Sequence, residues 1–345
     1  MIKQKVNIVF LSDTHLGLDY PLKPRIMRQH RGTDFFQNFE TVLAYAVQIK
    51  ADLVIHAGDF FFRSRIPTPI VDKAYQMLLD FTRYQIPICL VPGNHERSRL
   101  PDSLFLCHPM IHVFSECQTR LFTIKQTKIS VSGFPFERHN IRTRFKQLVR
   151  NCLWDEIRAE IKLLFFHQVI EGATVGPGDY RFPANSDSVA ISDLPDDAAA
   201  ILCGHIHRQQ ILRNHRNPDI PIILSGSTER TSFAEMNEEK GFCHLVFSPI
   251  TSRLTQIRFI PIRTRPMSDI LIPPNLQPDK VHVFLENCVR DIDKRAILRF
   301  KADTSIIHET AEKFTHSFLR SVLPETVNFS VSRSVYQNSD EQIIK

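Results

Sequence analysis

Residues 6–15, VNIVFLSDTH, join an apolar run to an aspartate and a histidine. The run from Val6 to Leu11 is short and ends abruptly at polar residues, which predicts a buried β-strand. Asp13 and His15 follow at once, and both residue types are ligands for divalent metal ions. The stretch therefore predicts a strand whose carboxyl end carries functional side chains.

The same alternation continues along the first quarter of the chain. Apolar runs over 52–55 and 86–91 predict two further buried strands. Between the strands, residues 35–49 and 70–79 place their apolar side chains on one helical face. Strands that alternate with helices in this way predict an α/β fold with parallel strands.

The pattern changes in the middle of the chain. Residues 121–131 predict a hairpin that turns at Gln126-Thr127. Five buried strands are predicted after the hairpin: 162–166, 199–203, 221–224, 242–247 and 254–259. The last three follow one another without helices between them. We expect the five strands to form a second, largely antiparallel sheet packed on the first. The predicted fold is therefore α/β, with two packed mixed β-sheets flanked by helices.

Prolines cluster at positions 261, 266, 273, 274 and 278, and this cluster predicts a domain boundary. Beyond it, residues 281–288 and 307–318 have helical spacing, while 297–302 and 327–335 are predicted strands. We therefore expect a large domain over residues 1–262 and a small α+β domain over residues 263–345.

Five segments end an apolar run with residues that can bind metal ions. Sites in open α/β sheets form beyond the carboxyl ends of the strands, so five strand ends would bring these side chains together. Each segment alone also fits a plain structural role, such as a capping aspartate or a hydrogen-bonded core histidine. Together they favour one metal site: Asp13-Thr14-His15, Gly58-Asp59, Gly93-Asn94-His95-Glu96, Phe166-His167 and Gly204-His205-Ile206-His207.

The residue types in these segments suit two divalent metal ions. Carboxylates and imidazoles bind zinc, manganese or iron, and one carboxylate can bridge two ions. Two ions about 3.5–4 Å apart can clamp the attacking and leaving oxygens of an in-line displacement. They also lower the pKa of a bound water from about 15.7 towards about 7. The expected nucleophile is therefore a metal-bound hydroxide, and the expected reaction is phosphoester hydrolysis.

Composition and charge limit the function less tightly. The chain has 345 residues and a net charge of +6, which suits an anionic substrate without demonstrating one. Seven cysteines without a CxxC pair predict reduced thiols in a cytoplasmic protein. No apolar run approaches the length of a transmembrane helix, so no membrane association is expected. The first residues predict a strand rather than a signal peptide.

The motifs Asp-x-His, Gly-Asp, Gly-Asn-His-Glu, His and Gly-His-x-His, in this order over about residues 1–260, resemble the calcineurin-like metallophosphoesterase superfamily. The resemblance implies two metal ions that share the bridging ligand Asp59. The ligands implied for the first ion are Asp13, His15, Asp59 and His207. Those implied for the second are Asp59, Asn94, His167 and His205. His95 is implied as the catalytic residue, which stabilises the transition state or protonates the leaving oxygen.

A finer resemblance lies in residues 225–242, SGSTERTSFAEMNEEKGF. This segment is similar to the SbcD-type nucleases of DNA double-strand-break repair, the family that includes the meiotic-recombination nuclease. The small C-terminal domain resembles that family's DNA-capping domain. The resemblance implies manganese as the metal, with iron, zinc and magnesium as alternatives. It further implies DNA as substrate, a coiled-coil SMC-like ATPase as partner, and a homodimer.

One position departs from that family, and several basic residues are candidates for substrate binding. Family nucleases often have a second catalytic histidine three residues after the bridging aspartate, where this chain has Phe62. Arg63 resembles the phosphate-binding arginine of protein serine/threonine phosphatases. Further candidates follow the first metal motif, namely Arg25, Arg28 and Arg31. Two others, Arg142 and Lys146, lie on a predicted helix, whose basic residues fit a solvated surface equally well.

Three functions are compatible with the sequence. The leading hypothesis is a metal-dependent DNA nuclease, exo- or endonucleolytic, that acts in DNA repair. The second keeps the chemistry but changes the substrate to a small-molecule or protein phosphoester. The third is a non-catalytic scaffold that binds DNA ends or an ATPase, and the complete set of metal ligands argues against it.

Overall fold

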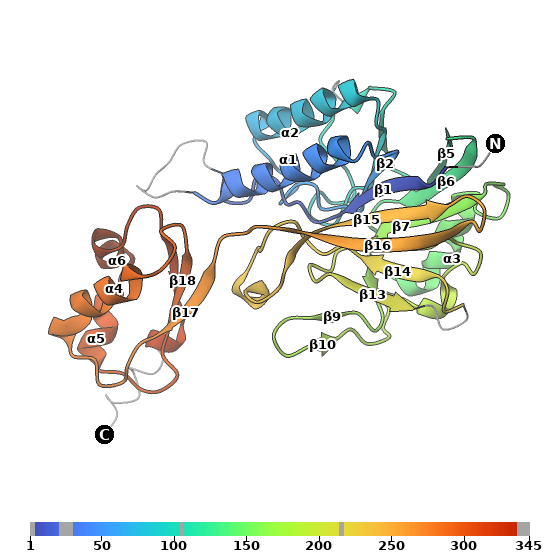
Figure 1. Cartoon of the computed structure of the whole chain (residues 1–345). Helices are drawn as coiled ribbons and strands as arrows, with labels where there is room; N and C mark the ends of the chain where they lie inside the picture. Colours follow the sequence, from blue (N-terminus) through green and yellow to red (C-terminus); the bar gives the residue numbers. More distant parts are fainter. Residues whose placement is uncertain (1–3, 21–29, 104–105, 214–216, 337–345) are drawn as a thin grey trace. The chain divides into compact units, whose positions relative to one another are not determined.

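The computed structural model describes residues 4–20, 30–103, 106–213 and 217–336, which Figure 1 draws in colour. Within these residues the chain forms two compact units. The first contains the described residues up to 19 together with 32–263. The second contains Tyr20, His30, Arg31 and the described residues from 264 onward.

The first sheet of the large unit has six strands in the order β16-β15-β1-β2-β3-β4. Strands β1 to β4 run parallel, with α1 (Gly32–Gln48) and α2 (Thr68–Phe81) in the connections between the first three. Their carboxyl ends therefore lie at one edge of the sheet. The strands span Val6–Leu11 (β1), Leu53–His56 (β2), Ile88–Leu90 (β3), Ile111–Val113 (β4), Lys240–Ser248 (β15) and Arg253–Ile262 (β16).

The prediction that residues 242–247 and 254–259 belong to the second sheet is wrong. β15 pairs antiparallel with β1, from Val6 opposite Phe247 to Phe10 opposite Cys243, and β16 pairs antiparallel with β15. β15 is buried at every position except Ser248, as expected for a strand inside a sheet that is covered on both faces. The two strands therefore extend the first sheet beyond β1.

The second sheet also has six strands, in the order β13-β14-β12-β7-β6-β5. Its four central strands run parallel, and only the edge strands β5 and β13 are antiparallel to their neighbours. A largely antiparallel second sheet is thus a wrong prediction, whereas two mixed sheets are confirmed. The strands span Gln118–Ile124 (β5), Thr127–Phe134 (β6), Ile161–His167 (β7), Ala200–Gly204 (β12), Gln210–Arg213 (β13) and Pro221–Leu224 (β14).

The hairpin between β5 and β6 turns one residue earlier than predicted. Lys125 and Gln126 both have positive φ, of 48° and 65°, whereas Thr127 already pairs with Ile124. Positive φ at both central residues is the geometry of two-residue turns that match the twist of the flanking strands. The turn therefore consists of Lys125 and Gln126.

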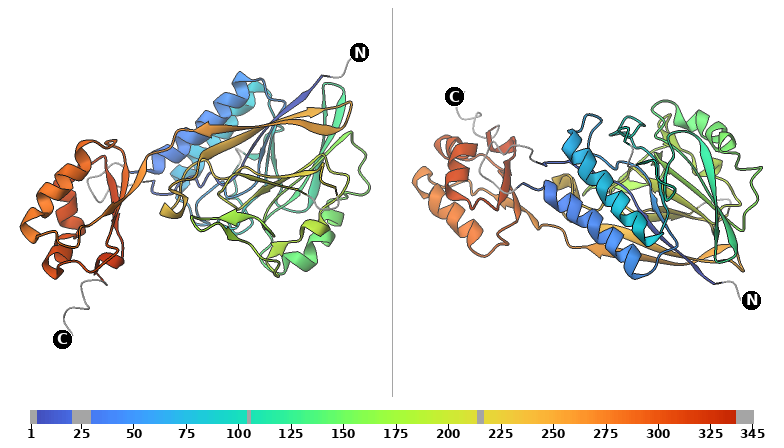
Figure 2. Two further views of the ribbon diagram at one scale, coloured as in Figure 1. Left: turned by 60° about the horizontal axis from the view of Figure 1, so that its bottom comes forward. Right: turned by 90° about the horizontal axis from the view of Figure 1, so that it is seen from above.

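Helices cover the outer faces of both sheets. α1 (Gly32–Gln48) and α2 (Thr68–Phe81) lie side by side over the first sheet, and α3 (Ile141–Asn151) covers the second (Figures 1 and 2). The apolar sides of α1 and α2 are buried, as their sequence spacing predicts. On α3, the ring of Phe145 lies 5.9 Å from that of Phe134 and 5.4 Å from that of Phe166. Each sheet is thus held between helices and the other sheet.

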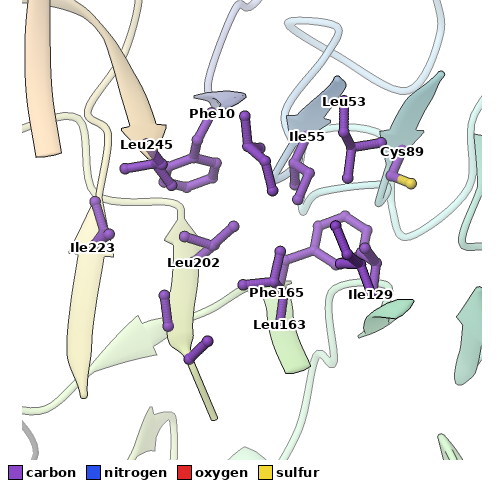
Figure 3. Packing of buried hydrophobic residues seen from close by; sticks show 14 of the residues in the cluster. Phe10, Leu53, Ile55, Cys89, Ile129, Leu163, Phe165, Leu202, Ile223 and Leu245 are labelled. Atoms are coloured by element: carbon purple, nitrogen blue, oxygen red, sulfur yellow. The ribbon is translucent and has the colours of Figure 1, made fainter. Parts of the chain in front are cut away.

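The main hydrophobic core lies between the two sheets, and Figure 3 shows part of it. Alternate side chains along each strand face this core, because successive residues of a strand point to opposite faces. The labelled members are all fully buried, from Phe10, Leu53, Ile55, Cys89 and Leu245 of the first sheet to Ile129, Leu163, Phe165, Leu202 and Ile223 of the second. Close packing here fixes the strand ends of one sheet relative to those of the other.

The second unit contains a parallel sheet, β17-β18-β19, and the helices α4, α5 and α6. β17 lies in the proline-rich segment, where the sequence predicts only a boundary. The helix predicted over 307–318 is two helices, because Thr315 caps a new one by accepting a hydrogen bond from the Phe318 amide. The elements span Met267–Leu271 (β17), Val281–Arg290 (α4), Ile297–Lys301 (β18), His308–Lys313 (α5), His316–Val322 (α6) and Asn328–Val331 (β19).

None of the helices in the described ranges has the length and apolar character that a bilayer-crossing segment needs. All seven cysteines fall within the described residues, and all are free thiols, in agreement with the sequence.

Candidate metal centre

The predicted metal ligands stand at or just beyond the carboxyl ends of five strands. Asp13 and His15 follow β1, Asp59 follows β2, and Asn94 follows β3 in the first sheet. In the second sheet, His167 is the last residue of β7, while His205 and His207 follow β12. Since the strands within each sheet are parallel and the sheets pack face to face, the seven side chains meet at one end of the sandwich.

One half of this cluster joins loops of both sheets. The Nε2 atoms of His15 and His207 are 2.9 Å apart. The Nε2 of His207 is 3.8 Å from Oδ1 of Asp13, and the Nε2 of His15 is 3.9 Å from Oδ2 of Asp59. The Asp13 carboxylate is further held by the backbone N–H of His205, which is 3.2 Å from both oxygens. These atoms surround one point with nitrogen and oxygen lone pairs.

The other half surrounds the amide oxygen of Asn94. The Oδ1 of Asn94 is 2.9 Å from Nε2 of His167 and 2.7 Å from Nδ1 of His205. The two ring nitrogens are 3.2 Å from each other. The Nε2 of His167 is also 3.3 Å from Oδ2 of Asp59. The same oxygen of Asp59 therefore lies near a histidine of each half.

The donor atoms fit divalent metal ions. Two ligands about 2.1 Å from one ion and about 90° apart are separated by about 3.0 Å, close to the observed spacing of the ring nitrogens. In the described part of the chain, three groups of His, Cys, Asp or Glu are close enough to hold a metal ion, and all three draw on this cluster. Nitrogen and carboxylate donors of this kind suit manganese, iron and zinc.

The pKa shifts of the histidines in the metal-free protein indicate which proton a bound cation would displace. Burial, followed by the charges of neighbouring histidines, holds the pKa of His15 well below its usual value. Burial likewise lowers the pKa of His205 to about 3, so both rings are neutral ligands. Burial opposes a charge on His167, yet the Asp59 carboxylate raises the pKa of His167 to about 9. A bound metal ion would displace that proton.

The backbone of these loops is held in an uncommon conformation. Asp13, His15, Asp59 and His205 all have positive φ, of 53°, 46°, 52° and 81°. This region is costly for residues with a side chain and recurs at functional sites. The loops after β1 and β2 hold each other there, since the amides of Asp13 and His15 donate to the carbonyls of Gly58 and Asp59 at 2.9 and 3.0 Å.

Gly93 allows the third loop to approach this arrangement. A Cβ at Gly93 would overlap the Asp59 carboxylate and its backbone nitrogen. The loop after β3 can therefore reach Asp59 only if this position lacks a side chain. This close approach gives a physical reason for the Gly-Asn-His order in the motif.

Two carboxylates that support the site were not singled out from the sequence. Glu235 accepts a hydrogen bond from Nδ1 of His207 at 3.1 Å, and Lys240 lies 2.6 Å from its other oxygen. Glu96 accepts from the Phe61 amide at 2.5 Å and from the Gly93 amide at 2.9 Å. Both residues stand in motifs quoted for the family resemblance. A carboxylate at fixed spacing inside such a motif was the available signal.

His95 differs from the predicted ligands in its exposure. Its side chain is 34% exposed, whereas those of His15 and His167 are fully buried. Its Nδ1 donates to the Phe62 carbonyl at 2.5 Å, which leaves Nε2 free of that bond and 3.8 Å from Oδ2 of Asp59. His95 can therefore reach both the cluster and a substrate held beside it.

The predicted substrate-binding residues are more scattered. Arg142 and Lys146 lie on α3, where they form ion pairs with Glu171 and Asp193 at 3.0 and 2.9 Å. Arg63 is exposed in the loop that follows Asp59, one residue beyond Phe62. Arg31 belongs to the second unit. Arg25 and Arg28 lie outside the described residues.

Comparison with known proteins identifies the family. Residues 6–209 match the family described as calcineurin-like phosphoesterase. The chain belongs to this family. The matched region runs from β1 to the loop after β12, so it contains every predicted ligand of this calcineurin-like phosphoesterase.

Curated relatives of this phosphoesterase are described as DNA double-strand break repair protein Mre11. The protein from Methanococcus maripaludis is 26% identical over 68% of this chain and 60% of its own length. That from Methanocaldococcus jannaschii is 25% identical over 81% of this chain and 73% of its own length. That from Archaeoglobus fulgidus is 24% identical over 86% and 68%. The resemblance to repair proteins inferred from the sequence is thus confirmed.

The phosphoesterase chain spans only part of several of these relatives, namely 60% of the Methanococcus maripaludis protein and 35% and 36% of those from two Methanosarcina species. Two solved structures match with a TM-score of 0.44 and 12% identity. They are a dimetal phosphatase from Danio rerio, over 70% of this chain and 92% of its own, and a hypothetical protein from Thermus thermophilus, over 75% and 99%.

Proposed function

We propose that the protein is a two-metal-dependent phosphodiesterase that hydrolyses DNA during DNA repair, as an exo- or endonuclease. The position of Asp59 gives the strongest support. Its Oδ2 is 3.9 Å from Nε2 of His15 in one half of the cluster and 3.3 Å from Nε2 of His167 in the other. A carboxylate shared by two sets of donors suits two ions that act together on one phosphate.

The proposed ligands divide between the two halves of the cluster. The first half would hold one divalent ion through Asp13, His15, Asp59 and His207. The second would hold another through Asp59, Asn94, His167 and His205. Bound ions there would polarise the phosphoryl group and lower the pKa of a coordinated water from about 15.7 to about 7. We propose manganese, with iron, zinc and magnesium as alternatives.

His95 is the proposed catalytic residue. Its Nδ1 hydrogen is committed to the Phe62 carbonyl, and its backbone N–H donates to Oδ1 of Asp59 at 3.0 Å. The ring is therefore held with Nε2 available beside the cluster. From there it can stabilise negative charge on the phosphoryl group or hand a proton to the leaving oxygen.

DNA is proposed as the substrate because the curated relatives are named for DNA double-strand break repair. Residues 263–345 are proposed as a capping and DNA-binding domain, which would supply further contacts with DNA. A coiled-coil SMC-like ATPase and a second copy of the chain are the proposed partners, and the cytoplasm is the proposed location. Arg63, Arg142 and Lys146 would contact phosphates of the substrate.

A metal and substrate panel tests this proposal. Metal-free protein would be reconstituted with manganese, magnesium or zinc and assayed on single-stranded, duplex and hairpin DNA. Bis-p-nitrophenyl phosphate and p-nitrophenyl phosphate would be assayed in parallel. We expect cleavage of DNA, with manganese giving the highest rate, and little release of phosphate from the monoester.

The panel separates the rival functions. Rapid turnover of the small esters without cleavage of any DNA would reject the nuclease and favour a small-molecule or protein phosphoester. If the protein bound two ions per chain but hydrolysed none of these substrates, only the scaffold function would remain.

A further inference from the structure

Two phenylalanines lie against different halves of the histidine cluster. The ring of Phe62 lies 5.4 Å from that of His95, at an angle of 39°, and 6.0 Å from that of His15. The ring of Phe136 lies 5.8 Å from that of His205, at 27°, and 6.1 Å from that of His167. The metal-binding candidates therefore have an aromatic ring beside each half.

Both rings are half-buried, unlike the phenylalanines next to them. Phe60, Phe61 and Phe134 are completely buried, whereas Phe62 and Phe136 keep part of their surface in solvent. Neither ring is among the fully buried hydrophobic side chains that form the core of the described residues. An aromatic side chain beside a polar site and outside the core is available to a ligand.

The backbone at each position is held independently of the ring. Phe62 donates its amide to the carbonyl of Leu16 at 3.1 Å, and its carbonyl accepts from His95. Phe136 donates its amide to the carbonyl of Pro92 at 3.0 Å, and its carbonyl accepts from Ser98 at 2.5 Å. These bonds anchor the loops without any contribution from the side chains. The aromatic rings are therefore not needed to position the loops.

We propose that Phe62 and Phe136 bind nucleobases by stacking, one on each side of the phosphate that is cleaved. This inference rests on the proposed function, because it names the form of DNA that the site takes. Stacking on an aromatic ring needs an open base face, and any base can supply one. Bases inside a duplex have both faces covered by their neighbours. The site therefore selects unpaired nucleotides, in single strands or at frayed ends.

The competing explanation is that the rings only shield the imidazoles or hold their orientation. Replacement by leucine separates the two, because leucine keeps an apolar contact with the imidazole but cannot stack as an aromatic ring does. Phe62→Leu and Phe136→Leu are the test variants, and Phe62→Trp and Phe136→Trp restore an aromatic surface. Phe122→Leu is the control, since Phe122 is also half-buried but lies on β5 at the edge of the second sheet.

The substrates are an oligothymidylate and an abasic strand of the same length, in which tetrahydrofuran replaces every nucleoside. With manganese bound, each leucine variant should lose about tenfold in kcat/KM on the thymidylate strand, as expected for one stacked base. It should lose less than about twofold on the abasic strand, where no base is present to stack. Each tryptophan variant should restore the rate, and the Phe122→Leu control should change neither rate.

A binding measurement provides a second readout. The chain has one tryptophan, Trp154, and it is buried. The fluorescence of the indole introduced by Phe62→Trp should be quenched by the thymidylate strand and not by the abasic strand. Calcium replaces manganese in this measurement to prevent cleavage.

Equal losses on both strands, or no loss on either, would overturn the stacking role while leaving the nuclease intact. Wild-type protein that cleaves duplex DNA but neither single strand would overturn the inference alone. Wild-type protein that cleaves no form of DNA but hydrolyses bis-p-nitrophenyl phosphate would overturn both the inference and the proposed function.

Discussion

Glu235 holds His207 in one orientation. Its Oε1 accepts the Nδ1 hydrogen of His207 at 3.1 Å, which directs the Nε2 of that ring toward His15. Lys240 supports the same carboxylate at 2.6 Å and donates to the His207 carbonyl at 2.9 Å. A carboxylate behind a histidine ligand fixes the tautomer and raises the basicity of the ring.

Replacing Glu235 should weaken metal binding. Glu235→Ala removes the acceptor of His207 and leaves the buried ammonium of Lys240 without its closer partner, so metal affinity should fall by about 10- to 100-fold. Glu235→Gln keeps an acceptor and should lose less. Isothermal titration calorimetry of the metal-free protein with manganese measures the change in affinity. Glu239→Gln, at an exposed position nearby, is the control, and an unchanged affinity in Glu235→Ala would contradict the assigned role.

Glu96 should contribute to the stability of the loops around Asp59. Its carboxylate is buried and accepts from two backbone amides, one from the loop after β2 and one from the loop after β3. Glu96→Ala leaves both amides without this partner, which should cost about 1–3 kcal/mol for each group that stays unsatisfied. Urea unfolding of the metal-free protein measures the loss. Equal stabilities of Glu96→Ala and wild type would show that the two loops do not depend on this carboxylate.

Adding a methyl group at Gly93 should disturb Asp59. In Gly93→Ala the new Cβ overlaps the Asp59 carboxylate, so either the loop or the bridging side chain must move. Metal binding and hydrolysis should both fall by at least about tenfold, since small displacements of a reacting group cost that much or more. Gly178→Ala is the matched control, because a Cβ there meets no atom within 4 Å. Equal behaviour of the two variants would argue against the tight approach.

The second unit should show a pH-dependent contribution from Asp269. Arg299 donates two hydrogen bonds to it, at 2.7 and 2.8 Å, and these hold the pKa of Asp269 below its usual value of 3.8. The stabilisation is therefore complete above about pH 4 and is lost as the pH falls through the lowered folded-state pKa. The pair is partly exposed, so its contribution should be below about 1 kcal/mol.

Unfolding free energies of wild type and Asp269→Asn, compared from pH 7 to pH 2, test this prediction. The difference between the two proteins should be constant near neutral pH and should shrink below about pH 4. A difference that grows in acid would have the wrong sign for this ion pair.

The sequence predicts the strand ends well because a buried strand is a continuous apolar run and the chemistry begins where the run stops. Leu11 followed by Ser12-Asp13, and Phe166 followed by His167, are examples. It does not predict sheet membership, which depends on the free edge that a strand meets in three dimensions. β15 accordingly pairs with β1, and β16 pairs with β15, although about 230 residues separate these two strands from β1.

Contacts between residues far apart in the chain cannot be predicted from the local sequence, for a related reason. Glu235 is 28 residues beyond His207, and nothing in the local pattern states that the two meet. The β17 strand shows another limit, because the prolines at 266 and 273 flank it and so obscure its apolar pattern.

The metal cluster is proposed to cleave DNA, with His95 as the catalytic side chain rather than a ligand. The most direct measurement compares wild type with His95→Ala for bound manganese and for cleavage of labelled single-stranded DNA. We predict two manganese ions per chain in both proteins, DNA cleavage by wild type, and a loss of at least about 100-fold in His95→Ala. Two ions bound to wild type without cleavage of any DNA, or undiminished cleavage by His95→Ala, would contradict the claim.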